Sequence, residues 1–171
     1  VCVPAGTRNH FAQDLGLDRD DVLGALDAFG PAVERSVDLA EVNGQVFVNN
    51  VSLGLYAKII QSPEYREAKG QTTATMLPEL LGPDAEPFDL HFTDGEGEQN
   101  HGAQLVQVSN NPYVLTSLTG FGTRAQLDTG RLGVAAAKVA GPAEVAAFVA
   151  AQGAGRLDRF SGWTEWSPQA F

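Results

Sequence analysis

Apolar side chains recur at helical spacing in three stretches of the chain. Residues 19–29 place their apolar side chains on one face, with Asp18 positioned to cap the first turn. Residues 142–152 are rich in alanine and carry Pro142 in the first turn, where a missing amide hydrogen costs little. Residues 70–81 form the third stretch. Its apolar positions, which belong either to the core or to a hydrophobic cleft, are Met76, Leu77, Leu80 and Leu81.

Alternating apolar and polar residues predict strands in much of the remaining chain. Asn43 and Gly44 make a strong two-residue turn, so the segments on either side should pair as a hairpin. A second hairpin should join 88–93 to 104–109 through a long charged tip over 94–102. The predicted strands are residues 36–42, 45–51, 88–93, 104–109, 131–139 and 159–167.

Strands outnumber helices in this pattern, which indicates an α+β fold: a mostly antiparallel, β-sandwich-like domain with about three helices. The chain has 171 residues, 43% of them hydrophobic, which is enough for one domain with a sizeable core. Its 19 glycines and nine prolines favour the many turns that such a fold needs. Trp163 and Trp166 are three residues apart and should lie on opposite faces of the last strand.

The formal net charge of −10 disfavours a nucleic-acid-binding role, because such proteins present a basic face. An anionic membrane would also repel the chain on average, so a peripheral membrane contact would need a local patch. The sequence has no signal peptide and no apolar run of transmembrane length. Cys2 is the single cysteine and cannot form an internal disulfide. We expect a cytoplasmic protein, with peripheral contact to the inner membrane face and homo-oligomerisation left open.

Residues 4–16 say more about chemistry than any other stretch. Pro4 fixes the backbone before a turn, and Gly6 lets the main chain come close to a ligand. Thr7 and Asn9 place short polar side chains where the following helix leaves amide groups free. Such a helix start suits phosphate, and it equally suits a plain helix-capping turn.

Four segments, in order, resemble the diacylglycerol kinase catalytic-domain family, which includes bacterial lipid kinases and sphingosine kinases. Residues 4–16 resemble its "P-x-G-T-x-N-D/H-F-A-x-x-L-G" segment, and residues 47–54 resemble its "F-x-N-x-x-S-x-G" strand and turn. Residues 66–70 resemble its "R-x-x-K-G". Residues 106–134 resemble its "V-x-V-x-N" strand and its "L-D-D-G-x-L-x-V" metal-site strand. The resemblance covers most of the chain.

The resemblance implies two parts in the chain. Residues 1–16 would be the tail end of a nucleotide-binding domain that is mostly missing, and 17–171 would be the β-rich, lipid-binding second domain, truncated at its C-terminus. Gly6, Thr7 and Asn9 would then contact ATP. The family's main phosphate loop, "G-G-D-G-T", is absent from these residues, so ATP binding should be weak or lost.

The same resemblance implies a magnesium site. Asp128 matches the first acid of the family's "D-D-G", whereas Thr129 replaces the second acid, which is the usual ligand. Main-chain oxygens of Gln126 and Arg131 would complete the site, and Mg²⁺ binding should be weak or lost. Turn preferences alone make Asp128-Thr129-Gly130 a plain turn before a strand.

The family's catalytic base is an Asp in a late "D-G-E" segment. Asp94-Gly95-Glu96 spells this motif but stands too early, so we expect a solvated turn there. The base would lie beyond Phe171, and no residue of this chain is assigned as catalytic. Surface or capping roles are expected for the three histidines, which lack metal-ligand spacing: His10, His91 and His101.

The implied parent protein is an ATP- and Mg²⁺-dependent lipid kinase that transfers the γ-phosphate to the hydroxyl of a diacylglycerol-like lipid. Its partners would be the lipid substrate and the missing nucleotide-binding domain, and these 171 residues alone should be inactive. Two alternatives stay open: an NAD-kinase-like enzyme, and a non-catalytic module that binds lipid or protein. The run from Thr7 to Ala12 argues against the first of these.

Overall fold

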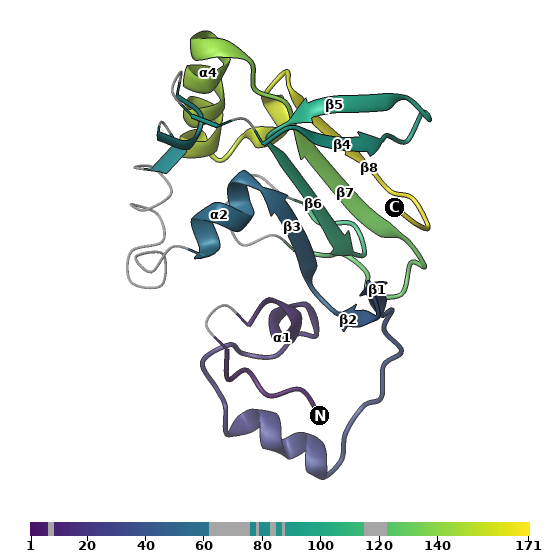
Figure 1. Cartoon of the computed structure of the whole chain (residues 1–171). Coiled ribbons are helices and arrows are strands. Elements are labelled where there is room, and N and C mark those ends of the chain that lie inside the picture. The colour runs from purple at the N-terminus through teal and green to yellow at the C-terminus, as the bar shows by residue number, and fades with distance from the viewer. Residues whose placement is uncertain (7–8, 62–75, 78, 83–84, 87, 115–122) are drawn as a thin grey trace.

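A four-stranded antiparallel sheet forms the centre of the fold. The computed structural model describes residues 1–6, 9–61, 76–77, 79–82, 85–86, 88–114 and 123–171 (Figure 1). The strands, in their order across the sheet, are β3 (Asn50–Gly54), β6 (Leu105–Asn110), β7 (Leu132–Ala137) and β8 (Trp163–Trp166). Every neighbouring pair is antiparallel, which confirms the expected fold class.

Helices cover one face of this sheet. These are α2 (Leu55–Gln61) and α4 (Gly141–Ala154), the second of which confirms the helix expected over 142–152. Ile59 of α2 and Phe148 of α4 have no exposed surface and pack in one core with Leu105 of β6. A short 3₁₀ turn, η3, follows α4 and buries its first residue in the same core. The bounds of η3 are Leu157–Arg159.

A second, smaller core lies on the opposite face of the sheet. It is closed by the hairpin of β4 (Leu90–Thr93) and β5 (Gln99–Ala103), which lies across the sheet in Figure 1. The ring of Trp166 stacks on Phe92 at 5.5 Å between centroids, whereas Trp163 packs in the helix-side core. The two tryptophans therefore lie on opposite faces, as expected. The buried residues of the second core are Phe92, Ala103, Val106, Val134 and Ala136.

The described residues that precede Ala40 form a lobe below the sheet in Figure 1. This lobe contains α1 (His10–Asp14) and the 3₁₀ helix η1 (Gly24–Phe29). The sequence predicts one amphipathic helix over 19–29, and this prediction is wrong in its length and its packing. Leu23 and Phe29 are 78% and 75% exposed, so within the described residues these side chains have no core to pack against. An apolar stripe forms a stable helix mainly by being buried, which explains why only the short η1 is found.

The first predicted hairpin is present, and its turn is the one expected. β1 (Ala40–Val42) pairs with β2 (Gln45–Phe47), and both turn residues have positive φ, 51° at Asn43 and 78° at Gly44. These angles match the two-residue turn that suits the twist of paired strands. The predicted return strand over 45–51 is divided, because its last residues start β3 and join the central sheet.

The prediction for the second hairpin gives the wrong partner strand. β4 pairs with β5, which lies inside the expected loop of 94–102, and the true turn spans 94–98. The expected partner over 104–109 is β6, which lies between β3 and β7 in the central sheet. β5 is polar and contains glycine because one of its faces is exposed, so its sequence resembles that of a loop.

The helix expected over 70–81 lies mostly outside the described residues. Where it is described, Leu77 is 1% exposed and belongs to the helix-side core, and Met76, Leu80 and Leu81 pack partly buried against it. Core packing is thus the role that the structure gives these four side chains. Among the described residues, no helix has the length and apolar character to cross a bilayer.

Candidate functional site

Hydrogen bonds made by Gly6 and Asn9 fix the shape of the predicted nucleotide-binding turn. The main-chain amide of Gly6 donates to Oδ1 of Asn9 at 2.7 Å. Nδ2 of Asn9 donates to the carbonyl oxygens of Pro4 and Arg19, at 2.9 and 3.1 Å. Asn9 precedes α1 with φ 53° and makes no side-chain bond to the helix, so the expected capping by Asn9 is not found. Thr7 lies outside the described residues.

A buried ion pair joins the end of α1 to a loop 110 residues later. Both Nε and Nη2 of Arg124 lie 2.7 Å from Oδ2 of Asp14. The side chains are 0% and 5% exposed, respectively. A carboxylate held by two guanidinium nitrogens is among the stronger hydrogen-bonded pairs in proteins, and here it fastens α1 to the sheet.

The remaining donors of Arg124 reach the sheet itself. Nη1 donates to the carbonyl oxygens of Val48, between β2 and β3, and of Asn110, at the end of β6. Nη2 donates to Oδ1 of Asn49 at 3.2 Å. The guanidinium carbon lies 4.9 Å from the centre of the Tyr113 ring, within the range of a cation–π contact. One side chain therefore connects the N-terminal lobe, the first hairpin and the central sheet.

The loop after Arg124 is closed by Thr129. Its amide and its Oγ1 both donate to Oδ1 of Asn111, at 3.0 and 2.6 Å, and Asn111 is fully buried with φ 69°. The amide of Arg131 donates to Thr129 Oγ1 at 3.2 Å, and the amide of Gly130 donates to Oδ2 of Asp38 at 2.7 Å. Thr129, which stands at the position of the family's second acid, thus forms hydrogen bonds within the loop and to Asn111.

The structure brings two of the three predicted metal residues to one pocket. Gln126 and Asp128 are exposed at the edge of a cavity of about 310 Å³, which also borders the Asp14–Arg124 pair. Arg131 borders another cavity. Its guanidinium donates to the carbonyl of Ser167. The first cavity is lined by residues 14, 35–37 and 124–128.

The donor set at this loop fits Mg²⁺ in kind. Mg²⁺ takes hard oxygen ligands, keeps several waters and is often held by only one or two carboxylates. Asp128 offers an exposed carboxylate. The carbonyl of Arg131 accepts a hydrogen bond from the Asn111 amide at 3.1 Å, and Thr129 Oγ1 lies at 3.5 Å as a second, longer donor. Among the described residues no cluster of three or more His, Cys, Asp or Glu could hold a metal, so such a site would rest on one carboxylate and water.

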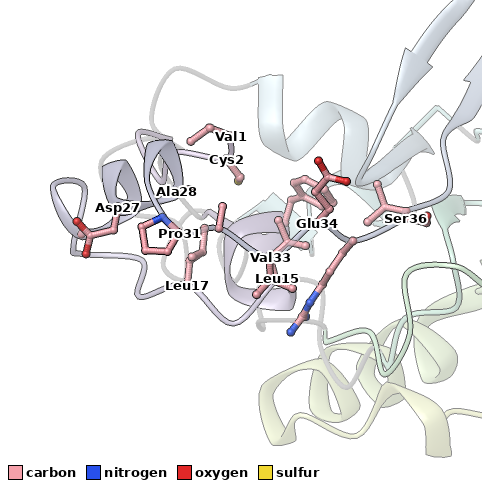
Figure 2. A pocket seen from close by; sticks show the side chains of 15 residues that line it. Val1, Cys2, Leu15, Leu17, Asp27, Ala28, Pro31, Val33, Glu34 and Ser36 are labelled. Atoms are coloured by element: carbon pink, nitrogen blue, oxygen red, sulfur yellow. The ribbon is translucent and has the colours of Figure 1, made fainter.

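A larger hollow, of about 1090 Å³, lies within the N-terminal lobe. Figure 2 shows its side chains: Asp27 lies at one end of the row, Glu34 and Ser36 lie at the other, and the apolar Leu15 and Val33 lie between them. Cys2 also borders this hollow and is half-buried. Both polar and apolar side chains line the hollow, and neither Gly6 nor Asn9 is among the described residues at its surface.

Tyr113 is a buried phenol beside the ion pair. Its hydroxyl has no hydrogen-bond partner among the described residues. Burial raises the pKa of Tyr113 to about 12, against the opposing effect of the nearby Arg124 guanidinium. The ring also borders a cavity of about 270 Å³ with Gln107, Ser109 and Glu165.

Several of these residues could not be found from the sequence. Nothing in the pattern distinguishes Arg124 or Asp14 from ordinary charged residues, because their partners are remote in the chain. Asn111 lies within the quoted 106–134 segment, and its buried amide is the part of that segment with a clear structural role. The two exposed histidines of the β4–β5 hairpin, thought to be scattered, face each other across the strands.

No protein-family model matches the chain. A 47-residue segment, 28% of the chain, is 47% identical to the diacylglycerol kinase of Bacillus subtilis strain 168 and covers 16% of that protein. Three solved structures from Bacillus anthracis Sterne, named as diacylglycerol kinases, resemble the fold over 97% of the chain. Their TM-scores are 0.64, 0.64 and 0.56, at 23%, 21% and 22% identity.

The chain spans about half the length of these solved structures: 55% of the first two and 52% of the third. At such identities the solved structures establish a shared fold. The local sequence match adds a curated protein of the same name. In sequence and fold the chain resembles the bacterial diacylglycerol kinases.

Proposed function

We propose that this chain is part of a lipid kinase that uses ATP and Mg²⁺ to phosphorylate the hydroxyl of a diacylglycerol-like lipid. The observation that carries the proposal is the 47% identity, over 47 residues, with a diacylglycerol kinase, supported by a fold shared over nearly the whole chain. In this reading residues 17–171 form the lipid-binding part. Residues 1–16 belong to the nucleotide-binding part, and the chain works together with the remainder of that part.

The nucleotide would approach the chain near α1. We propose that Gly6, Thr7 and Asn9 contact the nucleotide through the turn that precedes this helix. The hydrogen bond from the Gly6 amide to Asn9 Oδ1 fixes the shape of this turn and occupies that amide, so Gly6 would contribute the close approach of its main chain and not its N–H group. The exposed Arg35 borders the same cavity as Asp128 and would add positive charge where phosphates are held.

We further propose that Asp128 supplies a carboxylate to Mg²⁺, with main-chain oxygens of Gln126 and Arg131 and with water. When bound, the ion would spread the charge of the phosphates. Thr129 hydrogen-bonds within the loop and offers no charge, so affinity for the ion should be low. The geometry that favours this loop is the Asp14–Arg124 pair, which holds it beside the end of α1.

No residue of this chain is assigned as the base that takes the proton of the lipid hydroxyl. We therefore propose that the 171 residues alone do not transfer phosphate. The chain spans 55% of the length of the first solved structure, and this supports the proposal. An anionic membrane would on average repel a chain of net charge −10, so peripheral association with the inner membrane face would need a local patch.

The test is a phosphotransfer assay with the full-length protein, labelled ATP, Mg²⁺ and vesicles that contain diacylglycerol. Labelled lipid product is the expected result, with none from residues 1–171. Asp128→Asn should raise the Mg²⁺ concentration for half-maximal rate. Asp158→Asn, at an exposed turn after α4, is the matched control and should leave the rate unchanged.

Other outcomes would redirect the proposal. Phosphorylation of NAD with no lipid product would favour an NAD-kinase-like enzyme. Retention of lipid without turnover of ATP would favour a binding module.

A further inference from the structure

His91 and His101 form a pair on the exposed face of the β4–β5 hairpin. Their Nδ1 atoms lie 3.1 Å apart, and the rings meet edge to face with centroids 4.5 Å apart. Both histidines are exposed, whereas Phe92, which follows His91 in β4, is buried in the second core.

A β-bulge creates this pairing. Leu90 pairs with Ala103 and Phe92 with Asn100, so one residue of β4 faces two residues of β5. Gly102 occupies the bulge with φ 70°, a conformation that favours glycine. Bulges redirect side chains, and this one brings His101 beside His91.

A carboxylate fixes the orientation of one ring. Nε2 of His91 lies 3.0 Å from Oδ1 of Asp89, two residues earlier on the same face. A ring nitrogen that donates its hydrogen to a carboxylate leaves the other nitrogen as a free lone pair. In this tautomer Nδ1 of His91 accepts the Nδ1–H of His101, 3.1 Å away. The hydrogen bond from His91 holds the pKa of Asp89 below its usual value, and the amide of Gly102 adds to this effect.

We propose that His91 and His101 bind a transition-metal cation of the Zn²⁺ class through their Nδ1 atoms, with the Nδ1 proton of His101 moving to its own Nε2. Ligand nitrogens lie about 2.0–2.1 Å from Zn²⁺, so two of them are about 2.9 Å apart at a right angle and about 3.4 Å apart at the tetrahedral angle. The observed 3.1 Å lies between these limits. The rings need only pivot for both lone pairs to meet at one point.

Asp89 would then act as the carboxylate behind a metal-binding histidine. Metal-bound histidines nearly always donate their second ring N–H to such a group, which fixes the tautomer and raises the basicity of the ligand. Imidazole selects Zn²⁺, Ni²⁺ and Cu²⁺ over Mg²⁺, which prefers oxygen. The site is therefore independent of the proposed kinase chemistry. The remaining coordination positions face solvent, since the side chain of His91 is 56% exposed.

The test is calorimetric titration of Zn²⁺ into the full-length protein without a histidine tag, in the presence of excess Mg²⁺. We expect His91→Asn, His101→Asn and the double variant each to lose one binding equivalent or at least tenfold in affinity. Asp89→Asn should weaken binding by about 10–100-fold. His10→Gln removes the third histidine, which lies in α1, and should leave this binding unchanged.

Imidazole NMR resonances give a second readout. Zn²⁺ should shift the signals of His91 and His101 together, and the remaining N–H of His101 should be found at Nε2. Circular dichroism checks that each variant is folded. Equal Zn²⁺ binding by the wild type and the double variant, or shifts confined to one of the two rings, would overturn the proposal.

Discussion

Asp14 and Arg124 form a buried ion pair at 2.7 Å that fastens α1 to the central sheet. Breaking a buried pair from one side leaves the other charge without compensation and costs about 3–5 kcal/mol. Asp14→Asn should therefore lower the free energy of unfolding by an amount in this range, measured by urea denaturation.

The exposed Arg19–Asp20 pair supplies the control for that measurement. Its atoms lie 3.5 Å apart and its side chains are 38% and 84% exposed. Asp20→Asn should change stability by less than about 0.5 kcal/mol, because exposed pairs contribute little. If the two variants were equally stable, the pair would not be what holds α1 in place.

Thr129 should contribute to stability through its hydroxyl. Thr129→Val keeps the shape but removes the donor to buried Asn111 and the acceptor for the Arg131 amide. Leaving buried polar groups without partners costs about 1–3 kcal/mol. Thr129→Ser keeps the hydroxyl and should lose less than half as much in thermal or urea unfolding. A larger loss in the serine variant would contradict the role given to the hydroxyl.

Tyr113→Phe should be nearly neutral, within about 0.5 kcal/mol, or stabilising, since the hydroxyl it removes is buried without a described partner. In the wild type the folded-state pKa of about 12 is above the usual value of 10.0. Between pH 10 and about pH 12 the folded protein therefore keeps the phenol proton of Tyr113, whereas the unfolded chain has lost it. The stabilisation that the protonated Tyr113 gives to the folded state is complete below pH 10, and the free energy of unfolding falls as the pH rises from 10 toward 12. Alkaline unfolding curves and tyrosinate absorbance of wild type and variant would show whether this component belongs to Tyr113.

Acid should loosen the tip of the β4–β5 hairpin before the central sheet. The carboxylate of Asp94 accepts hydrogen bonds from the Asn100 side chain and from the amides of Glu96 and Glu98, and the first of these is the main reason its pKa is lowered from 3.8. Stabilisation from such a group is present above the unfolded pKa and is lost as the pH falls through the lower, folded value. The rate of amide hydrogen exchange in the β4–β5 hairpin of the wild type should increase as the pH falls through the folded pKa of Asp94. Asp94→Asn should show faster exchange already at neutral pH, whereas Glu96→Gln should not.

Local signals explain what the sequence analysis predicted correctly. The Asn43-Gly44 turn, the helix that starts at Gly141-Pro142 and the opposite faces of Trp163 and Trp166 each depend on residues close together in the chain. Backbone preferences and side-chain alternation are enough to identify such features. The antiparallel α+β class follows from the sum of these local features.

Features that depend on distant partners were missed or misassigned. β5 is polar and pairs with β4 through its main chain, so the alternation of apolar residues points instead to β6 as the return strand. The apolar residues of 19–29 suggested a helix because the spacing of Leu23 and Leu26 carries no information on whether a core is available. The hydrogen-bond acceptors of Arg124 lie as far apart in the chain as Asp14 and Asn110, and no local sequence pattern connects them. The predicted contacts of Gly6 and Asn9 with a nucleotide stay predictions, as does the Asp128 site.

The division of the sheet into two faces gives the protein a pair of native fluorescent reporters. Trp163 emits from the helix-side core and Trp166 from the aromatic stack beneath the hairpin. A variant that keeps only one of them follows the melting of only one layer. If the hairpin detaches first on heating, the emission of Trp166 will shift to the red while that of Trp163 stays in place. The order of unfolding of the two layers can then be read from the protein's own emission, without an added dye.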